Sequence, residues 1–236
     1  MRKVLSLALC FGLCGFLAML AFDYSKARDQ QLFGELVHRV ETDQPLIALT
    51  FDDGPTPRAV SILATLLEMD VTATFFLTGR EITANPEDAA MIVAQGHEIG
   101  NHSWDHPRMV LIWPSAVRDQ LSRTDQAIRA TGYDGPIHVR PPFGRKFIVL
   151  PRVLSQQDRT TIMWSIEPET TLGFDAAPEA LAQHVIETAQ PGDIVLLHGM
   201  YSTNDSTRAA LPLIINGLRA RGFSFVTVSD LIAAGG

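Results

Sequence analysis

Short apolar runs and longer amphipathic stretches alternate along the chain from residue 45 onward. Runs rich in β-branched and aromatic residues predict strands, which we expect at 46–51, 71–77, 97–101, 137–140, 160–166, 193–198 and 223–228. Apolar residues at helical spacing predict helices, which we expect at 58–69, 86–95, 115–130, 178–189 and 206–220. Strands separated mostly by helices indicate a parallel sheet, so the predicted fold class is α/β.

The absence of two motifs helps to predict the form of this sheet. The chain contains neither the Gly-x-Gly-x-x-Gly of dinucleotide-binding folds nor a phosphate-binding P-loop. A distorted (β/α) barrel of about seven parallel strands is therefore favoured over an open nucleotide-binding sheet.

The N-terminus differs from the remainder in being almost entirely apolar. Arg2 and Lys3 precede an uncharged run, Val4–Phe22, which is close to the ~20 residues that a membrane-spanning helix needs. No clear small-x-small cleavage site follows it. The pattern predicts a signal anchor or signal peptide over 1–22, a linker over 23–44 and one domain over 45–236. Because positive charge stays on the cytoplasmic side, the domain is expected outside the cytoplasm.

Composition supports one globular domain and excludes some classes of function. The 236 residues are 46% hydrophobic and 19% charged, which is enough for one substantial core. A net charge of -7 without a basic run argues against a nucleic-acid partner. The two cysteines, Cys10 and Cys14, both lie in the apolar N-terminal run. The domain therefore has no disulfide framework and no thiolate metal site.

Two adjacent carboxylates, Asp52 and Asp53, come directly after the first predicted strand of the domain. Gly54-Pro55 then forces a turn, so both side chains can reach one pocket at the carboxyl end of the strand. Carboxylates this close repel each other unless a cation or a proton lies between them. The pair predicts a metal ligand, a general base or both, and the alternative is a solvated turn.

Two histidines, His102 and His106, follow the strand predicted at 97–101. Their spacing of four would place both imidazoles on one side of a helical turn. Two imidazoles and a carboxylate form a common zinc site, and the carboxylates after the first strand would lie at the same rim. Asp105 lies off this face and is expected to be solvated.

Two further strand ends carry polar side chains. Arg140 precedes two prolines, where it could hold a buried carboxylate through a bidentate contact. His198 ends the strand predicted at 193–198, and an imidazole suits acid–base work near neutral pH. A single histidine at a strand end is nevertheless more often structural. The remaining histidines are expected to be structural or exposed: His38, His97, His138 and His184.

Four of these stretches occur in a fixed order along the chain. They are Thr50-Phe51-Asp52-Asp53-Gly54-Pro55, His102-Ser103-x-x-His106-Pro107, Arg140-Pro141-Pro142-Phe143-Gly144 and Leu196-Leu197-His198. Together they resemble the polysaccharide deacetylases, the family that shares the NodB homology domain (carbohydrate esterase family four). The resemblance covers about residues 45–234 and implies a distorted (β/α) barrel that removes acetyl groups from sugars.

The resemblance also implies a cofactor. Asp53, His102 and His106 would bind a divalent metal, Zn²⁺ first, with Co²⁺ or Ni²⁺ as alternatives. The ion would polarise the acetyl carbonyl and lower the pKa of its bound water.

Proton transfer would fall to residues at the other strand ends. The resemblance makes Asp52 the general base, with Arg140 orienting it, and gives the backbone N–H of Phe143 a role in stabilising the oxyanion. His198 would be the general acid that protonates the departing amine, and Leu196 would line the acetyl pocket. Amide hydrolysis requires these functions whatever the family.

One stretch departs from the family pattern. Many members carry Trp-Ser-Val-Asp-x-x-Asp-Trp, whose last Asp supports the acid histidine and whose last Trp lines the pocket. Here Trp164 opens the stretch, but Thr170 and Thr171 stand at those last two positions. We expect Trp164 on the substrate side and Glu169 as the replacement carboxylate, with Glu167 as its rival.

The sequence therefore predicts an extracytoplasmic, metal-dependent deacetylase. Its expected partners are an N-acetylated oligo- or polysaccharide, chito-oligosaccharides first, and the membrane through the N-terminal helix. Three alternatives stay open: a peptidoglycan deacetylase, a hydrolase of small cyclic amides or imides, and an inactive carbohydrate-binding module. The intact Asp52, Asp53, His102, His106 and His198 argue against the inactive module.

Overall fold

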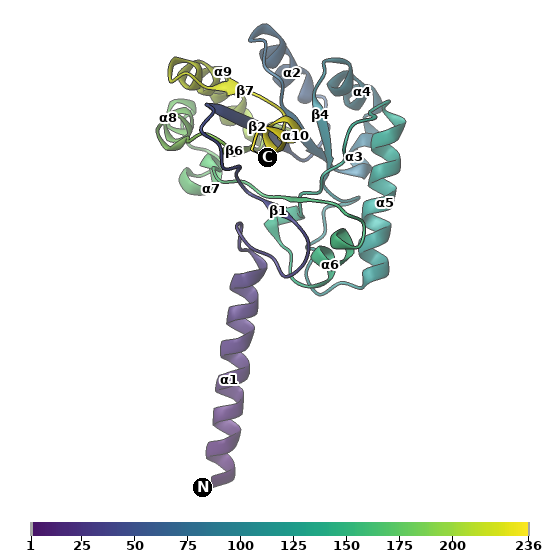
Figure 1. The fold of residues 1–236 in the computed structure, drawn as a ribbon, viewed down its shortest axis with the longest axis vertical. Helices are drawn as coiled ribbons and strands as arrows, with labels where there is room; N and C mark the ends of the chain where they lie inside the picture. The colour runs from purple at the N-terminus through teal and green to yellow at the C-terminus, as the bar shows by residue number, and fades with distance from the viewer. Residues whose placement is uncertain (1, 236) are drawn as a thin grey trace.

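The computed structural model describes residues 2–235, with side chains described from residue 12 onward. It confirms an α/β chain in which parallel strands alternate with helices (Figure 1). The strands are β1 (Leu36–Val37), β2 (Leu46–Asp52), β3 (Thr74–Leu77), β4 (Glu98–Asn101), β5 (Thr161–Ile162), β6 (Ile194–Leu197) and β7 (Ser224–Phe225).

The helices cover the sheet and connect its strands. The long ones are α1 (Arg2–Ser25), α2 (Ala59–Glu68), α4 (Pro86–Ala94), α5 (Pro114–Ala130), α8 (Pro178–Thr188) and α9 (Asp205–Ala220). The short ones are α3 (Gly79–Ala84), α6 (Val149–Ser155), α7 (Pro168–Leu172), α10 (Val228–Ala234) and the 3₁₀ turns η1 (Pro142–Gly144) and η2 (Ser202–Asn204). The sequence pattern predicted the long helices of the domain to within a few residues, but the short ones are new.

Strand β2 is the centre of the main sheet. The order is β4-β3-β2-β6, with β7 paired to the first residues of β2, and every ladder is parallel. Asp52 is in register with Phe76 of β3, and Asn101 of β4 is in register with Leu77. The carboxyl ends of these strands therefore meet at one edge, where we expected the site.

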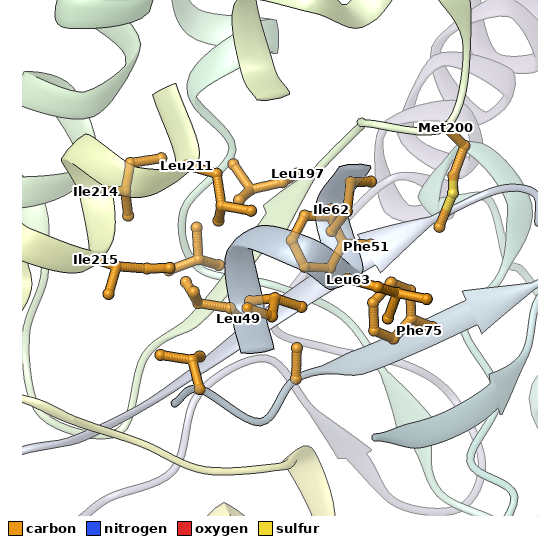
Figure 2. Close-up of a cluster of buried hydrophobic side chains, with 14 of the residues drawn as sticks. Leu49, Phe51, Ile62, Leu63, Phe75, Leu197, Met200, Leu211, Ile214 and Ile215 are labelled. Atoms are coloured by element: carbon orange, nitrogen blue, oxygen red, sulfur yellow. The ribbon is translucent and has the colours of Figure 1, made fainter. Parts of the chain in front are cut away.

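Alternation along β2 separates the core from the site. Ile47, Leu49 and Phe51 point into the main hydrophobic cluster, while Thr50 and Asp52 point to the opposite face. In the cluster, Phe51 stacks on Phe75 with ring centroids 5.0 Å apart (Figure 2). Three further side chains of this cluster come from α9: Leu211, Ile214 and Ile215. Burying each such side chain contributes roughly 1.5–3 kcal/mol, so this cluster fixes β2 firmly.

The remaining strands are shorter than the sequence predicted. Only Val139 of the expected strand 137–140 makes bridges, to Asn101 and to Thr161, because prolines at 136 and 141 supply no N–H donors. The expected strand 160–166 reduces to β5, which pairs with β1, and one bridge joins Ile166 to β6. The regular ladders thus form one five-stranded and one two-stranded sheet. Closure into a distorted barrel stays a prediction.

The N-terminal region contains one helix and one strand. α1 projects away from the domain (Figure 1), and β1 lies inside the predicted linker 23–44. Among the residues with described side chains, no helix is both long enough and apolar enough to cross a membrane. The predicted signal or anchor segment, 1–22, lies partly outside those residues and stays a prediction. Residues 22–29, which we call the N-terminal strap, lie against the domain.

Candidate active site

The carboxylates that follow β2 point into one cleft, as predicted. Asp52 ends the strand and is buried, while Asp53 has a φ of 72°, which turns the chain sharply at this point. The N–H of Asp53 donates to the carbonyl of Phe76 at 3.1 Å and so fixes the turn against β3. A positive φ is tolerated best by Gly, Asn and Asp, which explains an aspartate at this position.

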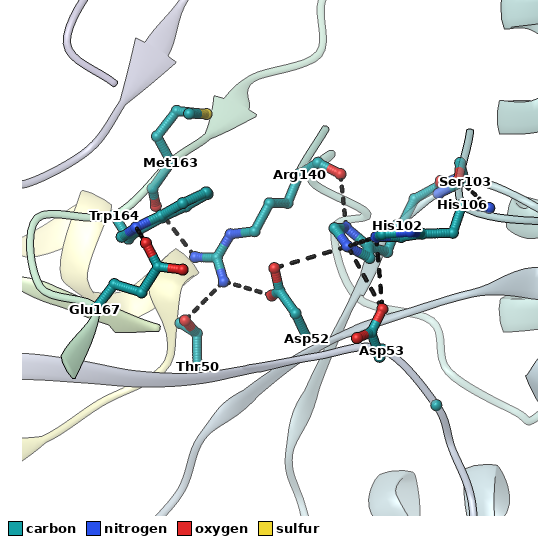
Figure 3. Close-up of polar contacts among 12 residues, drawn as sticks. Thr50, Asp52, Asp53, His102, Ser103, His106, Arg140, Met163, Trp164 and Glu167 are labelled. Atoms are coloured by element: carbon teal, nitrogen blue, oxygen red, sulfur yellow. Dashed lines mark hydrogen bonds and ion pairs between the residues drawn. The ribbon is translucent and has the colours of Figure 1, made fainter. Parts of the chain in front are cut away.

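The guanidinium of Arg140 holds the carboxylate of Asp52 in place (Figure 3). It is fully buried, and its Nη1 donates to Asp52 Oδ1 at 2.6 Å and to Thr50 Oγ1 at 2.7 Å. Its Nη2 donates to the carbonyl of Met163 at 3.1 Å. The contact with Asp52 therefore uses one nitrogen and is not bidentate, because Nη2 bonds to the backbone of Met163 and Nε has no partner among the described residues.

The charge of Asp52 is set by these neighbours. Burial alone would raise the pKa of Asp52, but the Arg140 guanidinium, followed by His102, outweighs it and holds this pKa below its usual range. Asp52 is therefore ionised at neutral pH.

The two histidines converge on Asp53 through a loop and not through a helical turn. Ser103 and His106 have φ values of 69° and 60°, and these left-handed residues curl the chain after β4. The Nε2 atoms of His102 and His106 lie 3.1 Å apart. Asp53 Oδ1 lies 4.0 Å from the first Nε2 and 3.6 Å from the second. The predicted convergence is confirmed, but the helical geometry proposed for it is wrong.

The hydrogen bonds of His102 decide its tautomer. Its Nδ1 lies 2.9 Å from the carbonyl oxygen of Arg140, which can only accept, so Nδ1 carries the proton. The Nε2 lone pair consequently faces Asp53 and His106. Burial lowers the pKa of His102, and burial together with His102 lowers the pKa of His106 to about 4. Both imidazoles are therefore uncharged at neutral pH, and each can offer a nitrogen lone pair to a metal ion.

Asp53, His102 and His106, which we call the metal rim, fit a divalent ion. One ligand atom from each lies within 4.8 Å of the others. Burial raises the pKa of Asp53, and His106 only partly opposes this, which indicates a carboxylate that lacks a full positive partner within the chain. Two imidazole nitrogens and one carboxylate oxygen are a donor set typical of catalytic zinc.

The metal rim opens into a cleft of about 900 Å³. Leu196 and Trp164, both predicted on the substrate side, line this cleft, as do Phe143 and His198. Phe143 has a φ of 57° and its ring packs 4.4 Å from the His106 ring, centroid to centroid. Asp105, by contrast, is exposed and bonded to Gln120, as expected of a solvated residue.

Phe174 and His198 also line the cleft, and together with Glu169, which bonds to His198, they form a second group that we call the acid side. Glu169 is buried in α7, and its Oε1 accepts from the backbone N–H of His198 at 2.8 Å and from Thr207 Oγ1 at 3.0 Å. In the described part of the chain, Glu169 Oε2 and His198 Nδ1 are both buried without a hydrogen-bond partner. Burial raises the pKa of Glu169, and the nearby His198 opposes this.

The rival carboxylate, Glu167, has other partners. Its Oε2 accepts from Trp164 Nε1 at 2.9 Å and from Arg28 Nη2 at 2.6 Å. Thr170 lines the cleft, and Thr171 Oγ1 donates back to the carbonyl of Glu167. Glu169 is thus the glutamate of this pair that contacts His198.

Sequence reasoning missed several residues of the cleft, among them Phe174, Arg28 and Arg145. Phe174 lines it and meets the His198 ring edge-on, with centroids 5.4 Å apart. An aromatic residue just after Gly173, near the missing Trp, was a usable signal. Arg28 and Arg145 also line the cleft, but they come from the strap and the loop after η1, and no local pattern links them to it.

Comparison with known proteins identifies the family of the chain. A model described as polysaccharide deacetylase matches residues 39–160, just over half of the chain. The chain belongs to the polysaccharide deacetylase family. The predicted resemblance is therefore confirmed.

Relatives within the family are moderately similar. A peptidoglycan-N-acetylglucosamine deacetylase of Listeria monocytogenes is 35% identical over 187 residues, which are 78% of this chain and 38% of the relative. A peptidoglycan-N-acetylglucosamine deacetylase of Bacillus cereus is 31% identical over 204 residues, 84% of this chain and 93% of the relative. The chain thus spans well under half the length of the Listeria relative.

One solved structure of the family bears on activity. A carbohydrate esterase family 4 pseudoenzyme from Bacillus anthracis matches with a TM-score of 0.77 and 30% identity, over 86% of this chain and 70% of that one. Membership of this polysaccharide deacetylase family therefore does not by itself establish catalysis. The family model includes the metal rim, Asp52 and Arg140, whereas the acid side lies beyond residue 160.

Proposed function

We propose that the protein is a metal-dependent deacetylase of N-acetylated sugars in oligo- or polysaccharides. The observation that carries this proposal is a neutral His102–His106 pair facing Asp53, beside a second carboxylate, Asp52, that Arg140 keeps ionised. A solvated turn would need neither the buried guanidinium nor the fixed tautomer of His102.

Asp53, His102 and His106 would hold the ion, with zinc favoured by the donor set and Co²⁺ or Ni²⁺ as alternatives. When bound, the ion polarises the acetyl carbonyl and lowers the pKa of a water molecule. Arg140 contributes to both halves of this centre, because its carbonyl fixes His102 while its guanidinium fixes Asp52.

Asp52 is the general base in this proposal. Its Oδ1 is occupied by Arg140, and its Oδ2 lies 3.7 Å from His102 Nε2, at the edge of the metal rim. An ionised carboxylate with one free oxygen in that position can accept a proton from an attacking water. The N–H of Phe143 would stabilise the oxyanion, since this residue borders the cleft next to His106.

His198 is the general acid, and Glu169 is its positioning residue. The main chain of His198 already bonds to Glu169, and each of these residues has one buried atom without a partner in the described chain, His198 Nδ1 and Glu169 Oε2. A small rotation of the imidazole would pair them and would stabilise its protonated form. Phe174 and Leu196 would then form the apolar walls for the acetyl methyl group.

For the substrate, two glycan classes have support. Chito-oligosaccharides fit the general chemistry of the site, while peptidoglycan is favoured by the deacetylases of Listeria and Bacillus cereus that resemble this chain. Peptidoglycan lies outside the cytoplasm, which agrees with the location expected from Arg2 and Lys3. A small cyclic amide is a weaker candidate because the cleft of about 900 Å³ is large for it.

Acetate release tests the proposal directly. The purified chain is assayed for acetate with chitin oligomers, peptidoglycan strands and acetylated xylan, and for ring opening with a cyclic imide, before and after chelation and after adding back Zn²⁺. We expect acetate from an N-acetylated glycan, loss on chelation and recovery with Zn²⁺. Full activity in a metal-free sample would contradict the metal role. Absence of acetate from every glycan, with zinc bound, would favour the carbohydrate-binding module.

A further inference from the structure

One wall of the cleft is formed by a segment far away in sequence. The N-terminal strap is fastened to the loop after η1, where the backbone N–H of Lys146 donates to the carbonyl of Ser25 at 2.9 Å and its ammonium bonds to the carbonyl of Ala27. Both Ser25 and Lys146 are almost fully buried. Lys26 and Arg28 of the strap line the cleft, and so does Arg145.

The charges on this wall do not cancel. Lys26 pairs with Asp23 at 2.8 Å, and Arg28 pairs with Glu167 at 2.6 Å. Among the described residues, Arg145 has no carboxylate within ion-pair distance. The wall therefore carries one uncompensated cation, although the whole chain has a net charge of -7.

Arg145 is held in place without using up its donors. Its Nη1 donates to Ser25 Oγ at 2.9 Å and to the carbonyl of Phe22 at 3.4 Å, and its guanidinium lies 4.4 Å from the Phe22 ring centroid. A guanidinium has five N–H donors in a planar fork that matches a carboxylate. The remaining edge of that fork is available to a group in the cleft.

The position of Arg145 relates it to the chemistry. It follows Phe143 by two residues, and both line the same cleft as His106. The acetyl group of a substrate at the metal rim would therefore have its sugar ring, or the next one, beside Arg145.

We propose that Arg145 forms a subsite for a carboxylate of the substrate. The protein accordingly prefers acidic glycans, in which the N-acetylated sugar or its neighbour carries a carboxylate, over neutral ones. This inference rests on the proposed deacetylase function and names the substrate class of the same cleft. A charge-assisted contact at a partly exposed site is expected to change affinity roughly tenfold.

The competing explanation is that Arg145 only fastens the strap. Ser25→Ala separates the two, because it removes the side-chain bond to Arg145 and leaves the cation in the cleft. If fastening is the whole role, Ser25→Ala and Arg145→Ala should have the same effect, and that effect should not depend on the charge of the substrate.

The experiment uses one acidic N-acetylated oligosaccharide and the same oligosaccharide with its carboxyl group reduced to an alcohol. The wild type should act on the acidic form with a KM about tenfold lower and a similar kcat, and added NaCl should erode the difference. Arg145→Ala should remove the preference by raising the KM of the acidic form toward that of the reduced form, and Arg145→Lys should keep part of it. Calorimetric binding of both oligosaccharides to metal-stripped protein should show the same preference.

Each remaining outcome has a distinct meaning. Equal KM values and equal binding of the two forms by the wild type would overturn the subsite and leave the deacetylase intact. A Ser25→Ala variant that loses the preference as fully as Arg145→Ala would overturn it too. If neither form releases acetate but metal-stripped protein still prefers the acidic one through Arg145, the subsite stands and the proposed reaction fails.

Discussion

The two sides of the cleft hold their polar side chains in different ways. At the metal rim, His102 Nδ1 bonds to the carbonyl of Arg140, and the neighbouring Asp52 bonds to its guanidinium. On the acid side, Glu169 Oε2 and His198 Nδ1 are buried without partners, among the residues that the structure describes. The rim atoms named here are thus paired before a substrate arrives, although Arg140 Nε is buried without a partner, whereas two polar atoms of the acid side have none in the described chain.

This difference follows from the elements that build each side. The rim and its base stand at the ends of β2 and β4. Parallel partners hold β2 on both sides, and β4 pairs with β3 along its whole length. The acid side comes from the five-residue α7 and from the loop after β6. Loops and short helices vary more easily than a central sheet, so the acid side is where a family can change its substrates.

The largest effect is expected from breaking the metal rim. His102→Ala removes a buried ligand whose tautomer is already fixed, so the purified variant should lose its metal, about one equivalent, and its turnover by about 10³-fold or more. Metal analysis alongside acetate release measures both. Asp105→Asn is the matched control in the same loop, because Asp105 is exposed and, in the described chain, bonds only to the Gln120 side chain.

The second largest effect distinguishes the general base from the metal ligands. Asp52→Asn should keep the metal but lower kcat by about 10²–10⁴-fold, because an amide cannot take the proton from water. Since Arg140 keeps Asp52 ionised, activity should persist on the acidic side of neutrality until this carboxylate protonates. Loss of metal from Asp52→Asn would instead mean that the roles of Asp52 and Asp53 are exchanged.

The fold was predictable wherever periodicity was strong. β2 and the long helices of the domain match their predicted ranges closely, because apolar alternation and helical spacing reflect the same burial that folds them. The strand expected at 137–140 does not form. Of these residues only Val139, which lies between the prolines at 136 and 141, makes bridges to neighbouring strands. β1 was missed because two residues carry no period, and it exists only through its pairing with β5.

The candidate site, like the fold, was predictable only in part. The rim could be predicted because strand ends of one parallel sheet must meet, whatever the details of the loops. The helical turn proposed for His102 and His106 was wrong, since the left-handed residues Ser103 and His106 cannot be read from spacing alone. Arg28 could not be predicted, because its partner Glu167 is 139 residues away and only the tertiary fold joins them.

A smaller effect is expected on the acid side. Glu169→Gln should lower kcat by about tenfold, because it removes the negative charge that favours the protonated imidazole of His198. The alkaline limb of the rate profile should move to lower pH in this variant. Glu169→Asp, which keeps the charge, should restore part of the rate, and a kcat–pH profile at saturating substrate measures both.

Glu167→Gln is the control for that experiment. Its Oε2 is engaged by Trp164 and Arg28, so the substitution should affect substrate affinity more than the pH profile. An alkaline limb that moves only in Glu167→Gln, or does not move in Glu169→Gln, would assign the supporting role elsewhere.

The smallest effect on turnover is expected from substituting His97, which lies outside the metal rim. This substitution tests whether burial keeps a histidine neutral. Like the rim histidines, His97 is buried, and burial lowers its pKa to about 4 from an ordinary 6.5. Its Nδ1 accepts the N–H of Ala73 at 3.3 Å, and its Nε2 is buried without a partner in the described chain.

The sign of the pH effect follows from these pKa values. Between pH 6.5 and about 4 the unfolded chain binds a proton at His97 and the folded chain does not, so folding becomes less favourable as pH falls through this window. The contribution is on the order of 1–2 kcal/mol at pH 5. His97→Gln can still accept from Ala73 but cannot titrate, so its urea midpoint should fall less than that of the wild type between pH 7.5 and 5. If the urea midpoints of the two proteins fall equally with pH, burial does not keep His97 neutral. The tautomer of His102 would then be the sole support for neutral rim histidines.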